Sequence, residues 1–212
     1  MQNSRNTICQ RGSSFGRVGM KIYLCRHGET TGDVEGRYGG DYDDHLTKKG
    51  IGESRKLARK LFEKKIELIC HSPKARTVET AKILQEKLKS PLQEIFDLRE
   101  RNHYGVLTGM TKQEALEKYP LQVKELQENP IHHKVMASED YGLFKVRVLS
   151  AFENIAGGEN KSIAIITHGG PIRCIVRELL KKEISSIGDC AVFELEKNKS
   201  GYKIINIDGA LL

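Results

Sequence analysis

The sequence predicts an α/β protein with a mostly parallel sheet covered by helices, and two features of the chain indicate this class. Short apolar runs alternate with segments of helical periodicity along most of the 212 residues, which is typical of parallel strands joined by helices. The apolar fraction of 38% and the charged fraction of 30% are those of a globular chain that can bury one sizeable core. We therefore expect one folded domain over residues 20–212.

The first half of the chain is expected to fold as strand, helix, strand, helix and strand. Residues 20–26 form an apolar strand, and Thr47 can cap a helix that runs to about Lys64. Residues 66–70 form the next strand, and a third strand lies near 92–96. The apolar residues of the first helix that should face the sheet are Leu57, Ala58, Leu61 and Phe62. The second helix carries Ala75, Val78, Ala81, Ile83, Leu84 and Leu88.

The second half contains a polar segment, 97–140, before the alternation resumes. This segment holds two prolines and is predicted to be a helical insertion. Beyond it, Gly157-Gly158 can end a helix, and Pro171 suits a first helical turn. The elements expected after the insertion are a helix over 141–156, a strand over 162–167, a helix over 171–182, and a closing hairpin of strands 190–196 and 201–208.

The chain is basic, with a formal net charge of +7, which limits its partners only loosely. Such a charge suits anionic substrates or nucleic acid, but the few aromatic residues and the lack of an arginine-rich stripe argue against nucleic acid. No apolar run approaches the roughly 20 residues that cross a bilayer, so we expect no membrane contact. The five cysteines include no Cys-x-x-Cys pair, which favours reduced cysteines and a cytoplasmic location. The oligomeric state is left open.

Residues 1–19 differ from the rest of the chain in composition. They hold three arginines, serine and glycine but no acidic residue, and they show no periodicity. This composition resembles an organellar transit peptide, whereas Met20 can also be the start of the folded domain, with 1–19 as an extension. We favour the extension, and we expect the segment to be disordered in either case.

Two of the expected strands end in a histidine followed by glycine. The first strand ends at Arg26-His27-Gly28, and the strand 162–167 is followed by His168-Gly169-Gly170. Ligands of open parallel sheets bind beyond the carboxyl ends of the strands, so both histidines should face one crevice.

A third strand end supplies another cation. HSPKAR (71–76) leads into a helix whose first turn should carry Arg76 among free backbone N–H groups. Two arginines, two histidines and helix N-termini together form an oxyanion pocket, and its best match is phosphate. An imidazole in this pocket can attack phosphorus and become phosphohistidine. Glu100 is the candidate acid that protonates the leaving alkoxide.

These motifs resemble those of the histidine phosphatase superfamily, the phosphoglycerate-mutase-like enzymes. Four segments carry the resemblance in the family's order, over about 20–208: RHGET (26–30), SPKARTVETA (72–81), LRERNHYGVLTG (98–109) and ITHGGPIR (166–173). The resemblance implies a three-layer α/β/α sandwich without a metal, in which the helical insertion 97–140 lies over the site.

The resemblance also implies a role for each residue of the site. His27 would be phosphorylated, Glu100 would act as acid and base, and His168 would join them in catalysis. The residues that would hold the phosphoryl group are Arg26, Arg76 and Gly169, together with His168. The residues that would contact the rest of the substrate are Thr30, Lys112 and Glu139. Asp33 stands where the family often has asparagine, and an acid there would repel phosphate unless it is paired.

Within the family, the sequence favours hydrolysis over the mutase reaction, in which the phosphoryl group returns to the substrate. HYGVLTGMTK (103–112) resembles the cofactor-dependent phosphoglycerate mutase, but Gln127 and Glu128 stand where that enzyme has paired arginines. His168 is followed by Gly-Gly, as in the phosphatases. We therefore expect a phosphatase that acts on a small phosphorylated metabolite without a cofactor. The alternative is a phosphoglycerate mutase that uses 2,3-bisphosphoglycerate.

Two remote alternatives stay open. Cys70 and Arg76 have the spacing of cysteine-dependent phosphatases, but the loop between them has no glycine with which to build a phosphate cradle. The other alternative is a non-catalytic module that binds a phosphorylated ligand, which Asp33 and the altered stretch ASED (137–140) favour.

Overall fold

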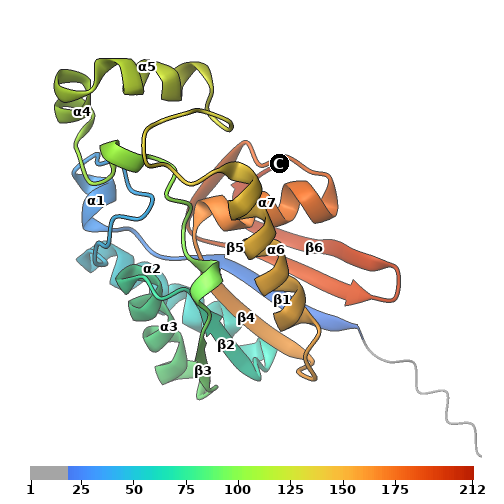
Figure 1. The fold of residues 1–212 in the computed structure, drawn as a ribbon. Helices are drawn as coiled ribbons and strands as arrows, with labels where there is room; N and C mark the ends of the chain where they lie inside the picture. The colour runs from blue at the N-terminus through green and yellow to red at the C-terminus, as the bar shows by residue number, and fades with distance from the viewer. Residues whose placement is uncertain (1–18) are drawn as a thin grey trace, which may run out of the picture.

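The structure, a computed structural model, describes residues 19–212 and contains one six-stranded sheet (Figure 1). The strands are β1 (Met20–Arg26), β2 (Leu68–His71), β3 (Leu92–Glu94), β4 (Ser162–Thr167), β5 (Ser186–Asn198) and β6 (Gly201–Leu211). They lie in the order β3-β2-β4-β1-β5-β6. The first four strands of this order are parallel, whereas β5 and β6 are antiparallel to their neighbours and form the predicted hairpin. The mostly parallel sheet is confirmed.

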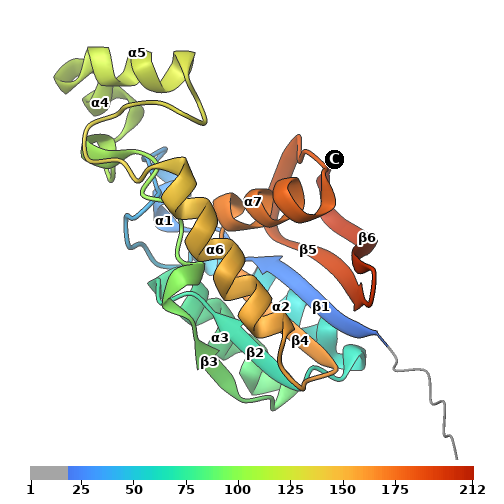
Figure 2. The ribbon, with the colours of Figure 1, turned by 45° about the vertical axis from the view of Figure 1, so that its right-hand side comes forward.

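Helices cover both faces of this sheet (Figures 1 and 2). α2 (Lys48–Leu61) and α3 (Ala75–Leu88) pack on one face. α6 (Tyr141–Ala156) and α7 (Gly169–Leu180) pack on the other. The predicted three-layer α/β/α sandwich is therefore confirmed.

Two apolar clusters separate the three layers. Alternate residues of β1 enter different clusters, because side chains of a strand point to opposite faces. Ile22 and Leu24 face α6 and α7, whereas Tyr23 and Cys25 face α2 and α3. All six residues of β4 are buried, as expected of a central parallel strand covered on both faces. This packing holds the carboxyl ends of β1, β4 and β2 side by side.

The polar segment 97–140 forms the predicted helical insertion. It contains α4 (Lys112–Lys118) and α5 (Pro120–Glu128), which lie beyond the sheet, near the short α1 (Thr31–Val34) in Figure 1. Short 3-10 turns at Phe96–Leu98 and Gly105–Leu107 precede these helices. The insertion has a small core of its own, made of Tyr38, Leu107, Ala115, Val123, Leu126 and Val135. Tyr38 comes from the loop after α1, so this core ties the insertion to the segment that follows β1.

Several element boundaries differ from the prediction, and one predicted core side chain is wrong. Phe62 is 49% exposed, because α2 ends at Leu61 and the 3-10 turn that follows carries Phe62 outward against Lys87. The predicted strand 92–96 ends at Glu94. β5 and β6 extend beyond the expected hairpin, and α7 begins at Gly169 rather than at Pro171.

The prediction of disorder for residues 1–19 falls on residues 1–18, which lie outside the described part of the chain. From residue 19 onward, none of the helices combines the length and apolar character that crossing a bilayer requires.

The central position of β4 leads to a first prediction. Ile165 is fully buried, so Ile165→Ala should lower the free energy of unfolding by about 2–5 kcal/mol. Ile205 on β6 is 46% exposed, and the matched variant Ile205→Ala should change it by less than about 0.5 kcal/mol. Urea unfolding measures the free energy of unfolding of both variants, and an equal loss in the two would contradict this account of the core.

Candidate active site

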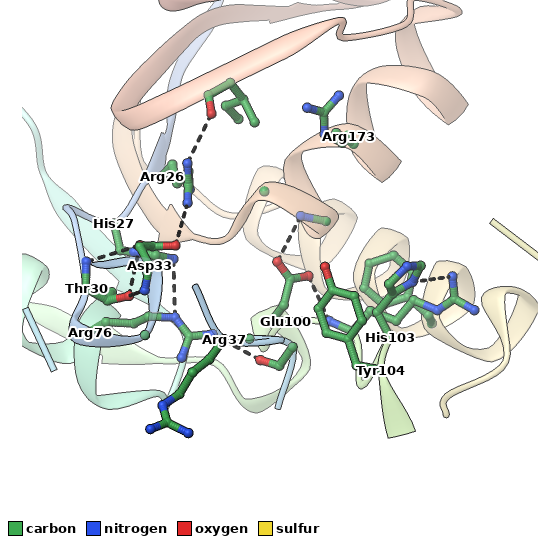
Figure 3. Close-up of a pocket in the computed structure, with 18 of the residues that line it drawn as sticks. Arg26, His27, Thr30, Asp33, Arg37, Arg76, Glu100, His103, Tyr104 and Arg173 are labelled. Carbon is green, nitrogen blue, oxygen red and sulfur yellow. Dashed lines mark hydrogen bonds and ion pairs between the residues drawn. The ribbon is translucent and has the colours of Figure 1, made fainter. Parts of the chain in front are cut away.

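Arg26, His27, Arg76, Glu100 and Gly169 line one cavity at the carboxyl ends of β1, β4 and β2 (Figure 3). His168 contacts Arg76 but is not part of the cavity wall. The cavity has a volume of about 470 Å³. The arginines that line it are Arg26, Arg37, Arg76, Arg101, Arg173 and Arg177, and the acids are Asp33, Asp44 and Glu100. Positive charge exceeds negative charge on these walls, which suits an anionic ligand.

His27 follows β1 and is 5% exposed. Its Nδ1 lies 2.8 Å from the carbonyl oxygen of Gly28, so Nδ1 carries the proton and donates it. The unprotonated Nε2 faces the cavity, 3.2 Å from Nε of Arg76. Burial, followed by the charges of Arg76 and Arg26, lowers the pKa of His27 well below its usual 6.5. The imidazole is therefore neutral at pH 7, the form that can act as a nucleophile.

Arg76 lies in the first turn of α3 and is 4% exposed. The loop after α1 fixes its guanidinium. Nη1 donates to Oδ1 of Asp44 at 2.8 Å and to the Tyr42 carbonyl at 2.7 Å. Nη2 donates to the Gly40 carbonyl at 3.1 Å. The orientation of the guanidinium is thus set on one side by an ion pair and two carbonyls, which leaves the Nε–H directed at the two histidines.

His168 supplies the second imidazole, at the N-terminal end of α7, and it is fully buried. Its Nδ1 lies 3.2 Å from Nε of Arg76, and its Nε2 lies 2.8 Å from Oγ of Ser72. Because the arginine N–H needs an acceptor, Nδ1 is unprotonated and Nε2 donates to the serine. Burial, with the charge of Arg76, also lowers the pKa of His168 well below 6.5. The two rings are edge-on, with centroids 5.2 Å apart.

Arg26, the last residue of β1, also lines the cavity and is held in place by two acids. Its Nη1 donates to the Ile187 carbonyl at 3.0 Å and lies 3.2 Å from Oδ1 of Asp189. Its Nη2 lies 3.7 Å from Oδ1 of Asp33. The other carboxylate oxygen of Asp33 accepts hydrogen bonds from the backbone N–H and the hydroxyl of Thr30. The acid that the sequence placed near the phosphate is therefore paired and caps α1. Since the Thr30 hydroxyl takes part in this cap, its contact with substrate stays a prediction.

Glu100 faces the cavity from the segment after the 3-10 turn at Phe96–Leu98. Its Oε2 accepts from the Gly170 N–H at 3.0 Å, and its Oε1 accepts from the Arg101 N–H at 2.8 Å. A Cβ at Gly170 would lie 2.1 Å from Oε1 of Glu100, so only glycine lets the carboxylate approach the first turn of α7. Gly169, the first residue of α7, lies beside it in the cavity wall.

Arg147 of α6 holds the segment that carries Glu100. Its guanidinium donates to the carbonyls of Asp97 (2.8 Å), Arg99 (2.9 Å) and Glu100 (3.1 Å). Glu139 binds the same guanidinium at 2.7 and 2.8 Å. The carboxylate of Glu139 is thus engaged away from the cavity, which it does not line, and its predicted contact with substrate stays untested.

Lys112 lies against aromatic rings at the start of α4. Its Nζ is 3.3 Å from the centroid of the Tyr38 ring and 5.6 Å from that of Tyr104. Burial lowers the pKa of Lys112. Tyr104 lines the cavity, whereas Lys112 stands behind it. A direct contact between Lys112 and substrate therefore stays a prediction.

Cys70 lies outside this constellation. The side chain is fully buried within β2, and burial raises the pKa of the thiol to about 12. A cysteine nucleophile needs to be a thiolate at neutral pH, so these surroundings oppose a cysteine-dependent mechanism.

Three residues that support the site escaped the sequence analysis: Asp44, Ser72 and Arg147. Asp44 contacts a residue 32 positions away, and Arg147 contacts residues 47 to 50 positions away, so no local pattern signals either. Ser72 stands inside a motif that was noticed for its arginine. In the described part of the chain, no three His, Cys, Asp or Glu side chains are grouped in a way that could hold a metal ion.

Comparison with known proteins decides the family. The model of the histidine phosphatase superfamily (branch 1) matches residues 22–207. The chain belongs to the histidine phosphatase superfamily. The resemblance carried by the four motifs is confirmed, and the chain is an enzyme that acts on phosphate esters.

Individual relatives of this histidine phosphatase differ in their named activities. It is 28% identical to phosphoserine phosphatase 1 of Hydrogenobacter thermophilus, over 89% of this chain and 87% of the relative. It is 32% identical to phosphoglycerate mutase-like protein 4 of Arabidopsis thaliana, over 73% and 69% of the two chains. The solved structure of Bacillus stearothermophilus YhfR superimposes with a TM-score of 0.82 at 24% identity, covering 91% of this chain and 98% of that one, which shows a shared fold.

The contact between Glu100 and Gly170 gives a second prediction. Gly170→Ala should displace the Glu100 carboxylate and lower kcat by about 10- to 100-fold, because the displaced proton donor no longer lies within hydrogen-bonding distance of the leaving oxygen. The control is Gly52→Ala in α2, away from the cavity wall, where a new Cβ would meet nothing within 4 Å. Steady-state kinetics on a phosphomonoester measures both variants. An equal loss of kcat in both variants, or no loss in either, would contradict the assignment of Glu100 as the proton donor.

Two buried histidines and the partly buried His103 give a third prediction, on stability. His27, His168 and His103 all have lowered pKa values in the fold, that of His103 to about 3, chiefly because of burial. Below the unfolded value of 6.5 the unfolded chain binds more protons, so stability falls as pH falls. At pH 5, His103 alone should cost about 2 kcal/mol relative to pH 7. Urea unfolding at both pH values should show a smaller loss for His103→Asn than for the wild type, and equal losses would contradict the assignment.

Proposed function

We propose that this protein hydrolyses phosphomonoesters of small metabolites through a phosphohistidine at His27. The observation that carries the proposal is the unprotonated Nε2 of His27, which faces the Nε–H of Arg76 at 3.2 Å beside a second buried imidazole. A nucleophile and cationic donors for the phosphoryl oxygens thus lie within one small site.

The first step transfers the phosphoryl group to the enzyme. The Nε2 lone pair of His27 attacks phosphorus, and the bond from phosphorus to the ester oxygen breaks. Arg76 and Arg26 stabilise the charge on the equatorial oxygens. The carboxyl group of Glu100 gives its proton to the departing alkoxide. The hydrogen bond from Nδ1 to the Gly28 carbonyl stabilises the positive charge that the ring acquires.

The second step transfers the phosphoryl group from His27 to water. Glu100, now a carboxylate, takes a proton from a water molecule, whose oxygen attacks phosphorus. The N–P bond breaks, inorganic phosphate leaves, and His27 is neutral again. His168 acts as a further donor to the phosphoryl oxygens in both steps as the neutral tautomer with its proton on Nδ1, while the Ser72 hydroxyl donates to Nε2.

Hydrolysis is favoured over the mutase reaction by the composition of α5. Gln127 and Glu128 stand near its end, where the mutase has paired arginines for a second phosphate. The resemblance to phosphoserine phosphatase 1 over most of both chains supports the same choice. The mutase stays the second candidate, supported by the likeness to phosphoglycerate mutase-like protein 4.

The nucleophile gives a fourth prediction. His27→Ala should lower kcat/KM by at least about a thousandfold, because the variant lacks the imidazole that takes the phosphoryl group. His132→Asn, at an exposed histidine of the insertion, should keep wild-type turnover. Phosphate release measures both, and circular dichroism checks that each variant is folded. Turnover by folded His27→Ala at the wild-type rate would rule out the mechanism.

Phosphorus NMR separates hydrolysis from isomerisation. The protein is incubated with 3-phosphoglycerate, with and without a trace of 2,3-bisphosphoglycerate. Inorganic phosphate without 2-phosphoglycerate is the expected result. Formation of 2-phosphoglycerate that depends on the bisphosphate would instead establish the mutase.

A further inference from the structure

The cavity holds more positive charge than the capture of one phosphoryl group uses. Four of its six arginines have a carboxylate partner within 4.0 Å. These ion pairs are Arg26 with Asp189 and Asp33, Arg37 with Glu35 and Glu114, Arg76 with Asp44, and Arg177 with Glu183. Among residues 19–212, neither Arg101 nor Arg173 has such a partner.

Arg101 lacks a carboxylate partner because its guanidinium binds backbone carbonyls within the insertion. It is 5% exposed and donates to the carbonyls of Glu139 (2.9 Å) and Ile131 (2.8 Å), with His103 Nδ1 at 3.2 Å. Its guanidinium therefore joins the segments of the insertion around residues 101, 131 and 139.

Arg173 differs, because within the described part of the chain its one side-chain hydrogen bond goes to the Ile184 carbonyl. It lies four residues, about one turn, after Gly169, so it shares the cavity-facing side of α7. Figure 3 shows it apart from His27 and Arg76, with Arg26 and Glu100 both nearer to them. Burial, then repulsion from Arg177 and Arg26, lowers the pKa of Arg173, which indicates a cation held at an electrostatic cost.

The position of Arg173 relates it to the leaving group of the substrate. The phosphoryl group would occupy the end of the cavity formed by His27 and Arg76, with its ester oxygen near Glu100. The rest of the substrate would then lie along the part of the cavity wall that Glu100 and Arg173 share. A planar guanidinium without a carboxylate partner suits a carboxylate or a second phosphate at that place.

We propose that Arg173 is a specificity-determining residue that binds an anionic group on the leaving alcohol. The preferred substrates are then phosphomonoesters of hydroxy acids or other anionic alcohols, rather than of neutral or cationic ones. This inference rests on the proposed function and adds the substrate class to it.

Matched substrates test the inference. O-Phosphoserine and O-phosphoethanolamine differ only by a carboxylate. Propane-1,3-diol bisphosphate and its monophosphate differ only by a second phosphate. The wild type should prefer the anionic member of at least one pair by roughly 10- to 100-fold in kcat/KM, the effect of one charged hydrogen-bonded contact. The pair that shows the preference identifies the anion as carboxylate or phosphate.

Variants on α7 assign the preference to one residue. Arg173→Gln should bring the ratio near unity, and Arg173→Lys should retain part of it. Arg177→Gln is the matched control, since that guanidinium is paired with Glu183 at 2.6 and 2.8 Å, and it should keep the wild-type ratio. Each ratio is taken within one protein preparation, so a loss of folded protein cancels.

The experiment distinguishes a failure of the inference on Arg173 from a failure of the proposed function. A wild-type ratio near unity in both pairs, or a ratio that survives Arg173→Gln, overturns the role of Arg173 while hydrolysis through His27 stands. If none of the four substrates, nor p-nitrophenyl phosphate, is hydrolysed, the proposed function fails as well.

Discussion

The Nε–H of Arg76, placed between two unprotonated imidazole nitrogens, is the interaction on which the rest of the site depends. It keeps both rings neutral and directs Nε2 of His27 into the cavity. The guanidinium can do this because Asp44 and two carbonyls hold its other end in a buried ion pair, with 5% and 6% of the side chains exposed. A buried cation needs such a partner, and removing one member of such a pair typically costs about 3–5 kcal/mol.

The sheet explains why residues so far apart in sequence meet at this point. β2, β4 and β1 are consecutive neighbours and all parallel, so their carboxyl ends lie at one edge. Each end delivers one part of the site: His27 after β1, Arg76 through the helix after β2, and His168 after β4. The same arrangement brings the N-terminus of α7 to Glu100, where the absence of a side chain at Gly170 makes room for the carboxylate.

The sequence was sufficient to predict a mostly parallel sheet and the polar residues that follow its strands, but not the order of the strands. Strand ends and their polar residues are local signals, and for that reason His27, Arg76 and His168 were found and do lie together. The partners of these residues were harder to find. Asp44 and Arg147 act through contacts between distant segments, and their sequence surroundings resemble ordinary surface loops or helices.

Motif matching did not predict the contacts that some residues make within the fold. Glu139 occupies a motif position, yet its carboxylate binds Arg147, and Lys112 lies over the Tyr38 ring. Phe62 continues the apolar spacing of α2 but falls just past the end of that helix, where the backbone turns it to solvent. These contacts depend on the tertiary structure, which residue type and spacing alone do not predict.

Mass spectrometry of the protein quenched at neutral or alkaline pH during turnover tests the central claim most directly. Phosphohistidine survives under these conditions, and peptide fragmentation locates the phosphoryl group. The account predicts an added phosphoryl group on His27 that disappears once substrate is exhausted. A phosphoryl group on Cys70 or His168 instead of His27 would contradict the account. An enzyme that stays unmodified during steady turnover, under conditions in which cleavage of the N–P bond limits the rate, would also contradict it.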